Sequence, residues 1–79
     1  MKWIAVESSA VSALGYDADR RRLGIEFRDS RLVYIYHAVP PLEFKGFLEA
    51  ESKGRYLTQV FLPKKYAYSG PFSSRTQAA

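Results

Sequence analysis

Residues 23–37 read LGIEFRDSRLVYIYH and contain two segments with the pattern of β-strands. In the first segment, Leu23, Ile25 and Phe27 alternate with glycine and charged residues, as in a strand that is buried on one face. The second segment, residues 32–37, is rich in β-branched and aromatic residues, which favour strands. Only residues 29–31 connect the two segments, so the strands are expected to be antiparallel, because a parallel crossover needs about a dozen residues.

A third strand is predicted before these two, and two helices after them. Residues 11–16 form the strand, and Asp17 and Asp19 then favour a turn. The first helix begins at Pro40 and Pro41, since proline is tolerated in a first turn. Its apolar stripe is expected to consist of Phe44, Phe47 and Leu48, with Glu43 among the residues on its other faces. Gly46 lies in the middle of this helix and indicates close packing at that point.

Ser52 is predicted to be the N-cap of the second helix, and Pro63 to end it. Its buried stripe is expected to consist of Tyr56, Leu57, Val60 and Phe61. Residues 64–68 are predicted to be extended. Because strands precede helices, the expected fold is α+β, a three-stranded antiparallel meander followed by two helices packed on one face of the sheet. Three phenylalanines are expected in its core: Phe27, Phe47 and Phe61.

The length and composition indicate one small globular domain. The chain has 79 residues, of which 47% are hydrophobic and 15% aromatic. The domain is expected to cover residues 1–68, and the small polar residues 69–79 to form a flexible C-terminal tail. The sequence contains no cysteine, no secretory signal and no apolar run of about 18 residues. A cytoplasmic protein without membrane contact is therefore expected.

The sequence offers little for catalysis or for a metal. His37 is the single histidine, and without cysteine it cannot assemble a metal site by itself. No pair of carboxylates is placed in an apolar setting that would raise a pKa for acid–base chemistry. No glycine-rich phosphate loop is present. The chain is therefore expected not to be an enzyme and to use no cofactor and no metal.

Six features in order resemble the KTSC domain, a module named for its occurrence at the C-terminus of some lysyl-tRNA synthetases. They are Ser8-Ser9 with Val11 and Leu14-Gly15-Tyr16-Asp17, then Leu23 with Phe27, Tyr34-Ile35-Tyr36, Val39-Pro40, Ala50-Glu51-Ser52-Lys53-Gly54-Arg55-Tyr56, and Tyr66-Ala67-Tyr68. The likeness covers roughly residues 3–68, and the chain looks like the small stand-alone bacterial members. Its family-motif residues are Tyr34, Tyr36, Ser52, Gly54 and Tyr56. Thr58 and Phe61-Leu62 depart from the pattern, where Asn and Ile-Arg are expected.

The resemblance and the charge distribution together favour RNA as a partner. RNA binding is what the synthetase context of the family implies. The formal net charge is +4, and residues 52–79 hold five basic residues and no acidic one, as expected of a surface that binds a polyanion. The candidate nucleic-acid contacts are Lys53, Arg55, Lys64, Lys65, Tyr66 and Tyr68, together with Arg20, Arg21 and Arg22. Four phosphate contacts at the first four positions would give a log–log salt slope of about −3 to −4.

Two alternatives stay open at this point. Tyr34 and Tyr36 share one face of a strand, where they either stack RNA bases or pack under the helices. If they pack under the helices, Val33 and Ile35 lie on the other face, beside Arg22, Glu26 or Arg28, and suit a dimer contact. The main hypothesis is a small non-catalytic binding domain for RNA. The alternative is a protein–protein interaction or self-association module that uses the open face of the sheet.

Overall fold

The computed structural model describes residues 1–73 and confirms an α+β fold with an antiparallel sheet. Three strands lie where the sequence predicted them: β2 (Val11–Asp17), β3 (Arg22–Phe27) and β4 (Leu32–Tyr36). The side chain of Asp17 accepts hydrogen bonds from the backbone N–H groups of Asp19 and Arg20, at 3.1 and 3.3 Å. This side-chain turn connects β2 to β3, as the aspartates indicated.

The sheet has five strands, so the prediction of a three-stranded meander was wrong in its strand count. Strand β1 (Lys2–Ala5) pairs with β2, strand β5 (Tyr68–Ser73) pairs with β4, and the strand order is β1-β2-β3-β4-β5. Neither edge strand shows a clear alternating pattern, because all four residues of β1 and most of β5 are exposed. Residues 69–73 of the predicted tail therefore belong to the sheet, and residues 74–79 lie outside the described part of the chain.

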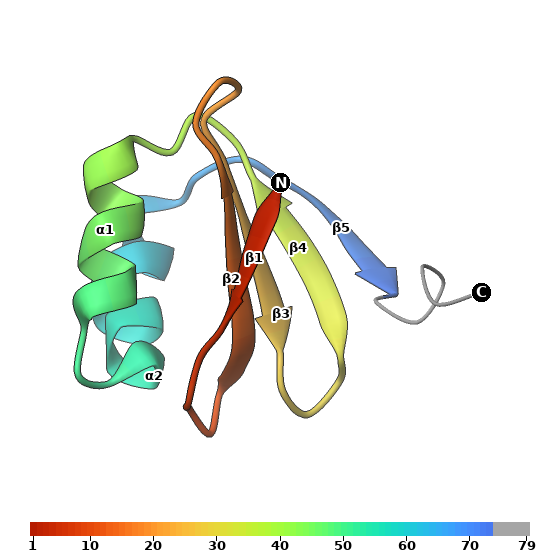
Figure 1. The fold of residues 1–79 in the computed structure, drawn as a ribbon, viewed down its shortest axis with the longest axis vertical. Coiled ribbons are helices and arrows are strands. Elements are labelled where there is room, and N and C mark those ends of the chain that lie inside the picture. Colours follow the sequence, from red (N-terminus) through yellow and green to blue (C-terminus); the bar gives the residue numbers. More distant parts are fainter. Residues whose placement is uncertain (74–79) are drawn as a thin grey trace.

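The helices pack on one face of the sheet and leave the other face uncovered (Figure 1). Helix α1 (Pro41–Glu49) has Pro40 as its N-cap. Helix α2 (Lys53–Arg55) has Ser52 as its N-cap, whose hydroxyl accepts a hydrogen bond from the backbone N–H of Arg55. Helix α2 continues as the π-helical segment η1 (Tyr56–Phe61) and the 3-10 turn η2 (Leu62–Lys64). The predicted first turns and the predicted cap are confirmed.

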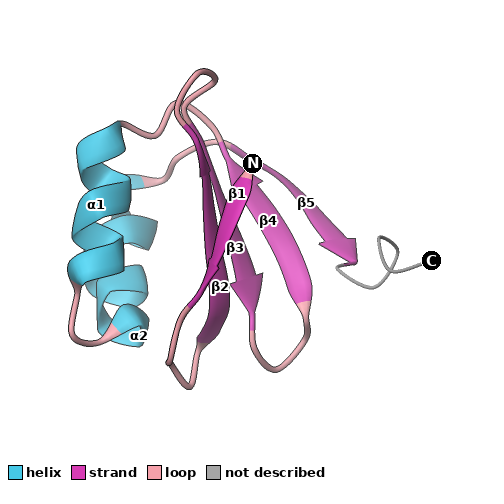
Figure 2. Ribbon diagram, viewed as in Figure 1, coloured by secondary structure: helices cyan, strands magenta, loops and turns pink. Residues whose placement is uncertain are grey.

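The segment after η2 differs from the prediction of an extended stretch at residues 64–68. Lys64 belongs to the 3-10 turn, and Lys65 has a left-handed backbone with φ 55°. The chain then crosses to the far edge of the sheet, where Ala67 accepts a hydrogen bond from the backbone N–H of His37 at 2.8 Å. The crossing from the helices to β5 is visible in Figure 2, and the strand itself begins at Tyr68.

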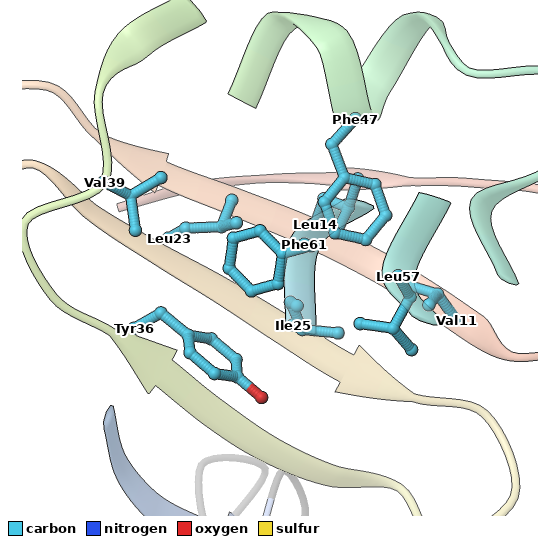
Figure 3. Packing of buried hydrophobic residues seen from close by; sticks show 9 residues of the cluster. All are labelled: Val11, Leu14, Leu23, Ile25, Tyr36, Val39, Phe47, Leu57 and Phe61. Carbon is cyan, nitrogen blue, oxygen red and sulfur yellow. The ribbon is translucent and has the colours of Figure 1, made fainter. Parts of the chain in front are cut away.

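The core lies between the helices and the covered face of the sheet (Figure 3). Phe47 and Phe61 are fully buried there, as predicted, whereas Phe27 is only partly buried at the margin. Leu57 is buried but Val60 is exposed, so the predicted stripe of the second helix is correct only in part. The buried apolar residues are Val11, Leu14, Leu23, Ile25, Tyr36, Val39, Phe47, Leu57 and Phe61.

The uncovered surface of the sheet, called the open face below, is built around two paired glycines. Gly15 and Gly24 are direct neighbours in β2 and β3, and Trp3 in β1 is the partner of Gly15. A Cβ added at Gly24 would lie 2.5 Å from Cη2 of Trp3. The indole of Trp3 therefore lies directly on the glycine backbone, and this contact adds to the backbone pairing that joins β1 to β2.

Candidate functional site

An open groove runs along β4 on the helix side of the sheet. Its volume is about 890 Å³. One wall is the C-terminal end of the second helical run, the floor is β4, and the far wall is Tyr68 at the start of β5. The lining residues are Ala10, Phe27, Asp29, Ser30, Leu32, Tyr34, Tyr36, Phe61, Leu62, Lys65, Tyr66 and Tyr68. We call this feature the tyrosine groove.

Four tyrosines from two separate stretches of sequence meet in the tyrosine groove. The ring centroid of Tyr68 lies 5.6 Å from the centroids of both Tyr34 and Tyr36. Tyr66 stacks on Phe61 on the helical wall, with centroids 5.1 Å apart. Tyr36 is nearly buried, with its ring edge-on to Phe61, but Tyr68 is 58% exposed. Tyr36 therefore packs under the helices, while the ring of Tyr68 is exposed to solvent.

Glu43 is a buried carboxylate that holds the helical wall in place. Its oxygens accept hydrogen bonds from Nζ of Lys64 at 2.5 Å, from the hydroxyl of Tyr66 at 2.9 Å, and from the hydroxyl of Tyr56. Burial raises the pKa of Glu43, but the hydrogen bonds from Lys64, Tyr56 and Tyr66 outweigh it, so the pKa is lowered overall. The charged form of Glu43 thus ties α1 to both ends of the second helical run.

The same network affects both tyrosines that donate to Glu43. Burial and the neighbouring carboxylate raise the pKa of Tyr56 and of Tyr66 to about 12. Gly46 has a role here, because a Cβ at this position would lie 2.9 Å from the hydroxyl oxygen of Tyr56. The close packing predicted at Gly46 is therefore present. Because Gly46 has no side chain, the Tyr56 hydroxyl has room to lie against α1.

Glu43 lies on the buried face of α1, so its predicted position on the other faces of the helix was wrong. Glu43 and Phe47 are the two buried residues of α1, whereas Phe44 and Leu48 are partly buried. The spacing of Glu43 and Phe47, four residues apart, places them on the same helix face and was the available signal. A carboxylate on this face stays charged because three donors reach it.

The predicted basic contacts are dispersed over the surface. Lys65 lines the tyrosine groove, but Lys64 is paired with Glu43. Nζ of Lys53 donates to the carbonyl oxygen of Ala50 at 2.6 Å. Arg55 lies at the opposite end of the helical run from the two lysines, next to a shallow pocket lined partly by Ser52 and Tyr56.

The arginines of the β2–β3 turn are also separate from the groove. Arg20 pairs with Asp17 at 3.3 Å, and Arg21 has a left-handed backbone whose carbonyl accepts from Val39. Arg22 begins β3 and is exposed. Of the nine candidate nucleic-acid contacts, the structure brings together Lys65, Tyr66 and Tyr68, and it adds Tyr34 and Tyr36 from the family motif.

The single histidine contacts a serine of β5. Nε2 of His37 lies 2.7 Å from Oγ of Ser69, which connects the end of β4 to β5. Within residues 1–73, no cluster of three or more His, Cys, Asp or Glu side chains is placed to hold a metal ion. No helix in this part of the chain is long and apolar enough to cross a bilayer.

The comparison with protein families identifies the chain. The model of the KTSC domain matches residues 7–66, which include β2 to β4, both helices and Tyr66. The chain belongs to the KTSC domain family. The matched region contains the family-motif residues Tyr34, Tyr36, Ser52, Gly54 and Tyr56. It ends two residues before Tyr68, so β5 and the exposed ring of the groove lie beyond it.

Relatives of nearly the same length support this assignment. An uncharacterised protein of Stutzerimonas stutzeri strain A1501 is 46% identical over 68 residues, which cover 86% of this chain and 94% of the relative. A protein of Tsukamurella paurometabola is 41% identical over 59 residues, or 75% of this chain and 87% of the relative. The crystal structure of a KTSC domain protein from Yersinia pestis is 35% identical, with a TM-score of 0.78, over 86% of this chain and 93% of that one. The similarity therefore covers most of the length of each of these proteins.

Proposed function

We propose that this KTSC domain is a non-catalytic, cytoplasmic binding domain that holds single-stranded RNA in the tyrosine groove. The observation that carries the proposal is the convergence of Tyr34, Tyr36, Tyr66 and Tyr68 on one open groove with Lys65 at its margin. Aromatic rings beside a cation suit unpaired nucleotides, since bases stack on the rings and the cation meets phosphate.

Stacking on Tyr68 is expected to supply most of the affinity. Its ring is 58% exposed, yet Tyr34 and Tyr36 support it at 5.6 Å on the groove side. A supported ring loses little freedom on binding, which favours its use as a stacking surface. Each base stacked on an aromatic side chain contributes about 1–3 kcal/mol, and the contact tolerates any base. The binding is therefore expected to have little sequence preference.

The electrostatic contribution to RNA affinity is expected to be smaller than the number of basic residues in the C-terminal third predicts. Lys65 is the basic residue that lines the groove within residues 1–73, while Lys64 and Lys53 donate to protein oxygens. Asp29 lines the same groove, so its charge opposes that of Lys65. One neutralised phosphate gives a log–log salt slope of about −0.7 for a single strand. This slope is shallower than the value of about −3 to −4 that four phosphate contacts would give.

The experiment is an anisotropy titration of a fluorescent single-stranded RNA of mixed sequence at two salt concentrations. Tyr68→Ala is expected to raise the dissociation constant about 5- to 150-fold, which corresponds to the loss of one stacked base. Lys65→Gln is expected to weaken binding at low salt and to reduce the salt slope. Arg55→Gln is the matched control, because it removes the same charge away from the groove and is expected to change only the weak long-range attraction.

Two results would contradict the proposal. The first is no measurable affinity of the wild-type domain for RNA at low salt. The second is binding that Tyr68→Ala leaves unchanged while Arg55→Gln weakens it, which would place RNA on the α2 surface. Circular dichroism of each variant checks that the fold is intact.

A further inference from the structure

The open face carries an apolar cleft between two exposed aromatic rings. Trp3 and Phe72 are 43% and 50% exposed, and they stand on either side of Ala13, Val33 and Ile35. The cleft has a volume of about 300 Å³ and also contacts Glu26 and Ser73. Val33 and Glu26 are direct neighbours across β3 and β4, so the apolar pair lies where the sequence predicted it.

We propose that the open face binds a second copy of this chain, so that the domain forms a weak, symmetric dimer through face-to-face packing of the two sheets. The face has a cleft and an exposed aromatic ring beside it. In a two-fold dimer the aromatic ring of each copy meets the cleft of the other copy, so the same contact forms twice. Phe72 of one copy then enters the cleft of the other, which at about 300 Å³ has room for a phenyl ring.

The charge on the open face also favours a second copy. Both acidic side chains of this face are already paired, Asp17 with Arg20 at 3.3 Å and Glu26 with Arg31 at 3.4 Å. Arg22 and Arg28 lie at the two ends of β3, whereas the centre of the face holds the glycine pair, Val33 and Ile35. Two copies that approach through this uncharged centre keep their basic residues at the margins of the contact.

The contact surface is preorganised but small. Trp3 is held on the glycine pair, so its ring is already positioned before binding. Five strands at about 4.8 Å spacing and about five residues of 3.3 Å each give a footprint of roughly 400 Å². Stable interfaces bury about 800 Å² on each partner. A reversible dimer with a dissociation constant in the micromolar range or above is therefore expected.

The test uses the intrinsic fluorescence of Trp3, the single tryptophan of the chain, together with sedimentation velocity. Both are measured from about 1 µM to 1 mM, the range that brackets a weak dimer. With rising concentration, the sedimentation coefficient is expected to increase from monomer to dimer, and the emission of Trp3 to shift to shorter wavelength as the indole is covered. Phe72→Ser is expected to raise the dissociation constant at least tenfold.

Leu42→Ser is the matched control. Leu42 is 78% exposed on α1, away from the open face, so the replacement of an exposed apolar side chain by serine there is expected to leave the dimer unchanged. The proposal is overturned if the wild-type chain stays monomeric at 1 mM with unchanged emission. It is also overturned if a dimer forms that Leu42→Ser weakens and Phe72→Ser does not, since the helical side would then be the interface.

Discussion

Gly24→Ala is expected to destabilise the domain, and the reason lies in Trp3 rather than in the glycine backbone. Gly24 is inside β3 and has no left-handed φ, so alanine fits its backbone conformation. The new Cβ would lie 2.5 Å from Cη2 and 3.0 Å from Cζ2 of Trp3, distances at which the indole must move away. The substitution therefore acts by detaching Trp3 from the open face.

The expected magnitude follows from the burial of Trp3. The side chain is 43% exposed, so slightly more than half of its surface is buried against the sheet. An aromatic side chain buries about 150–250 Å², and at about 25 cal/mol per Å² the loss of half of that area costs about 2–3 kcal/mol. Alanine in place of glycine within a strand returns about 0.5–1 kcal/mol. The free energy of unfolding is expected to fall by about 1–2.5 kcal/mol, within the range of overpacked sites.

A double-mutant cycle with Trp3→Ala gives the decisive result. Once the indole is removed, the remaining near contact of the new Cβ is Sδ of the flexible Met1 side chain at 3.0 Å. The same substitution is then expected to be neutral or to stabilise the domain by up to about 1 kcal/mol. Guanidinium unfolding followed by far-ultraviolet circular dichroism measures all four chains. Gly54→Ala is the control, because its Cβ would meet only Ala10 at 3.5 Å and its effect is expected to be independent of Trp3. If Gly24→Ala destabilises the Trp3→Ala chain as much as the wild type, the contact with the indole is not the cause.

Four further outcomes are expected. Phe61→Ala removes a fully buried ring and is expected to lower the free energy of unfolding by about 3–5 kcal/mol in a denaturant titration; a loss below about 1 kcal/mol would contradict its central place in the core. Glu43→Leu leaves three donors without their acceptor and is expected to destabilise more than Glu43→Gln, which keeps an acceptor; wild-type stability in both variants would mean that the network adds no stability. The pKa of Glu43 is lowered in the folded protein. Its ionised form therefore stabilises the fold above its ordinary pKa of 4.5, and this stabilisation is lost as the pH falls through the folded pKa. The melting temperature of the wild type is expected to fall in acid for this reason, and that of Glu43→Gln is expected to lack this fall. The pKa of Tyr56 and of Tyr66 is raised from 10 to about 12. Their neutral hydroxyls therefore stabilise the fold below pH 10, and this stabilisation is lost as the pH rises to about 12. Tyr66→Phe is expected to reduce the fall of the melting temperature at alkaline pH.

The sequence by itself determined the elements whose signals are local. The alternation of Leu23, Ile25 and Phe27 shows the buried face of β3, because successive side chains in a strand point to opposite sides. Pro41 and Ser52 mark the helix starts, because the unpaired N–H groups of a first turn restrict which residues fit there. The ordered motifs identified the KTSC family, which the match over residues 7–66 confirmed.

The tertiary structure alone decided the edges of the sheet and the make-up of both surfaces. Strands β1 and β5 are exposed and gain their order from pairing with β2 and β4, so their own residues show little alternation. Trp3 is attached by glycines that lie 12 and 21 positions later, and Glu43 by donors 13 to 23 positions away. Contacts at such separations leave no periodic signal in a single sequence, because they depend on where the chain returns in space. The tyrosine groove also depends on contacts between distant parts of the sequence. Tyr68 lies beside Tyr34 and Tyr36 because β5 pairs with β4.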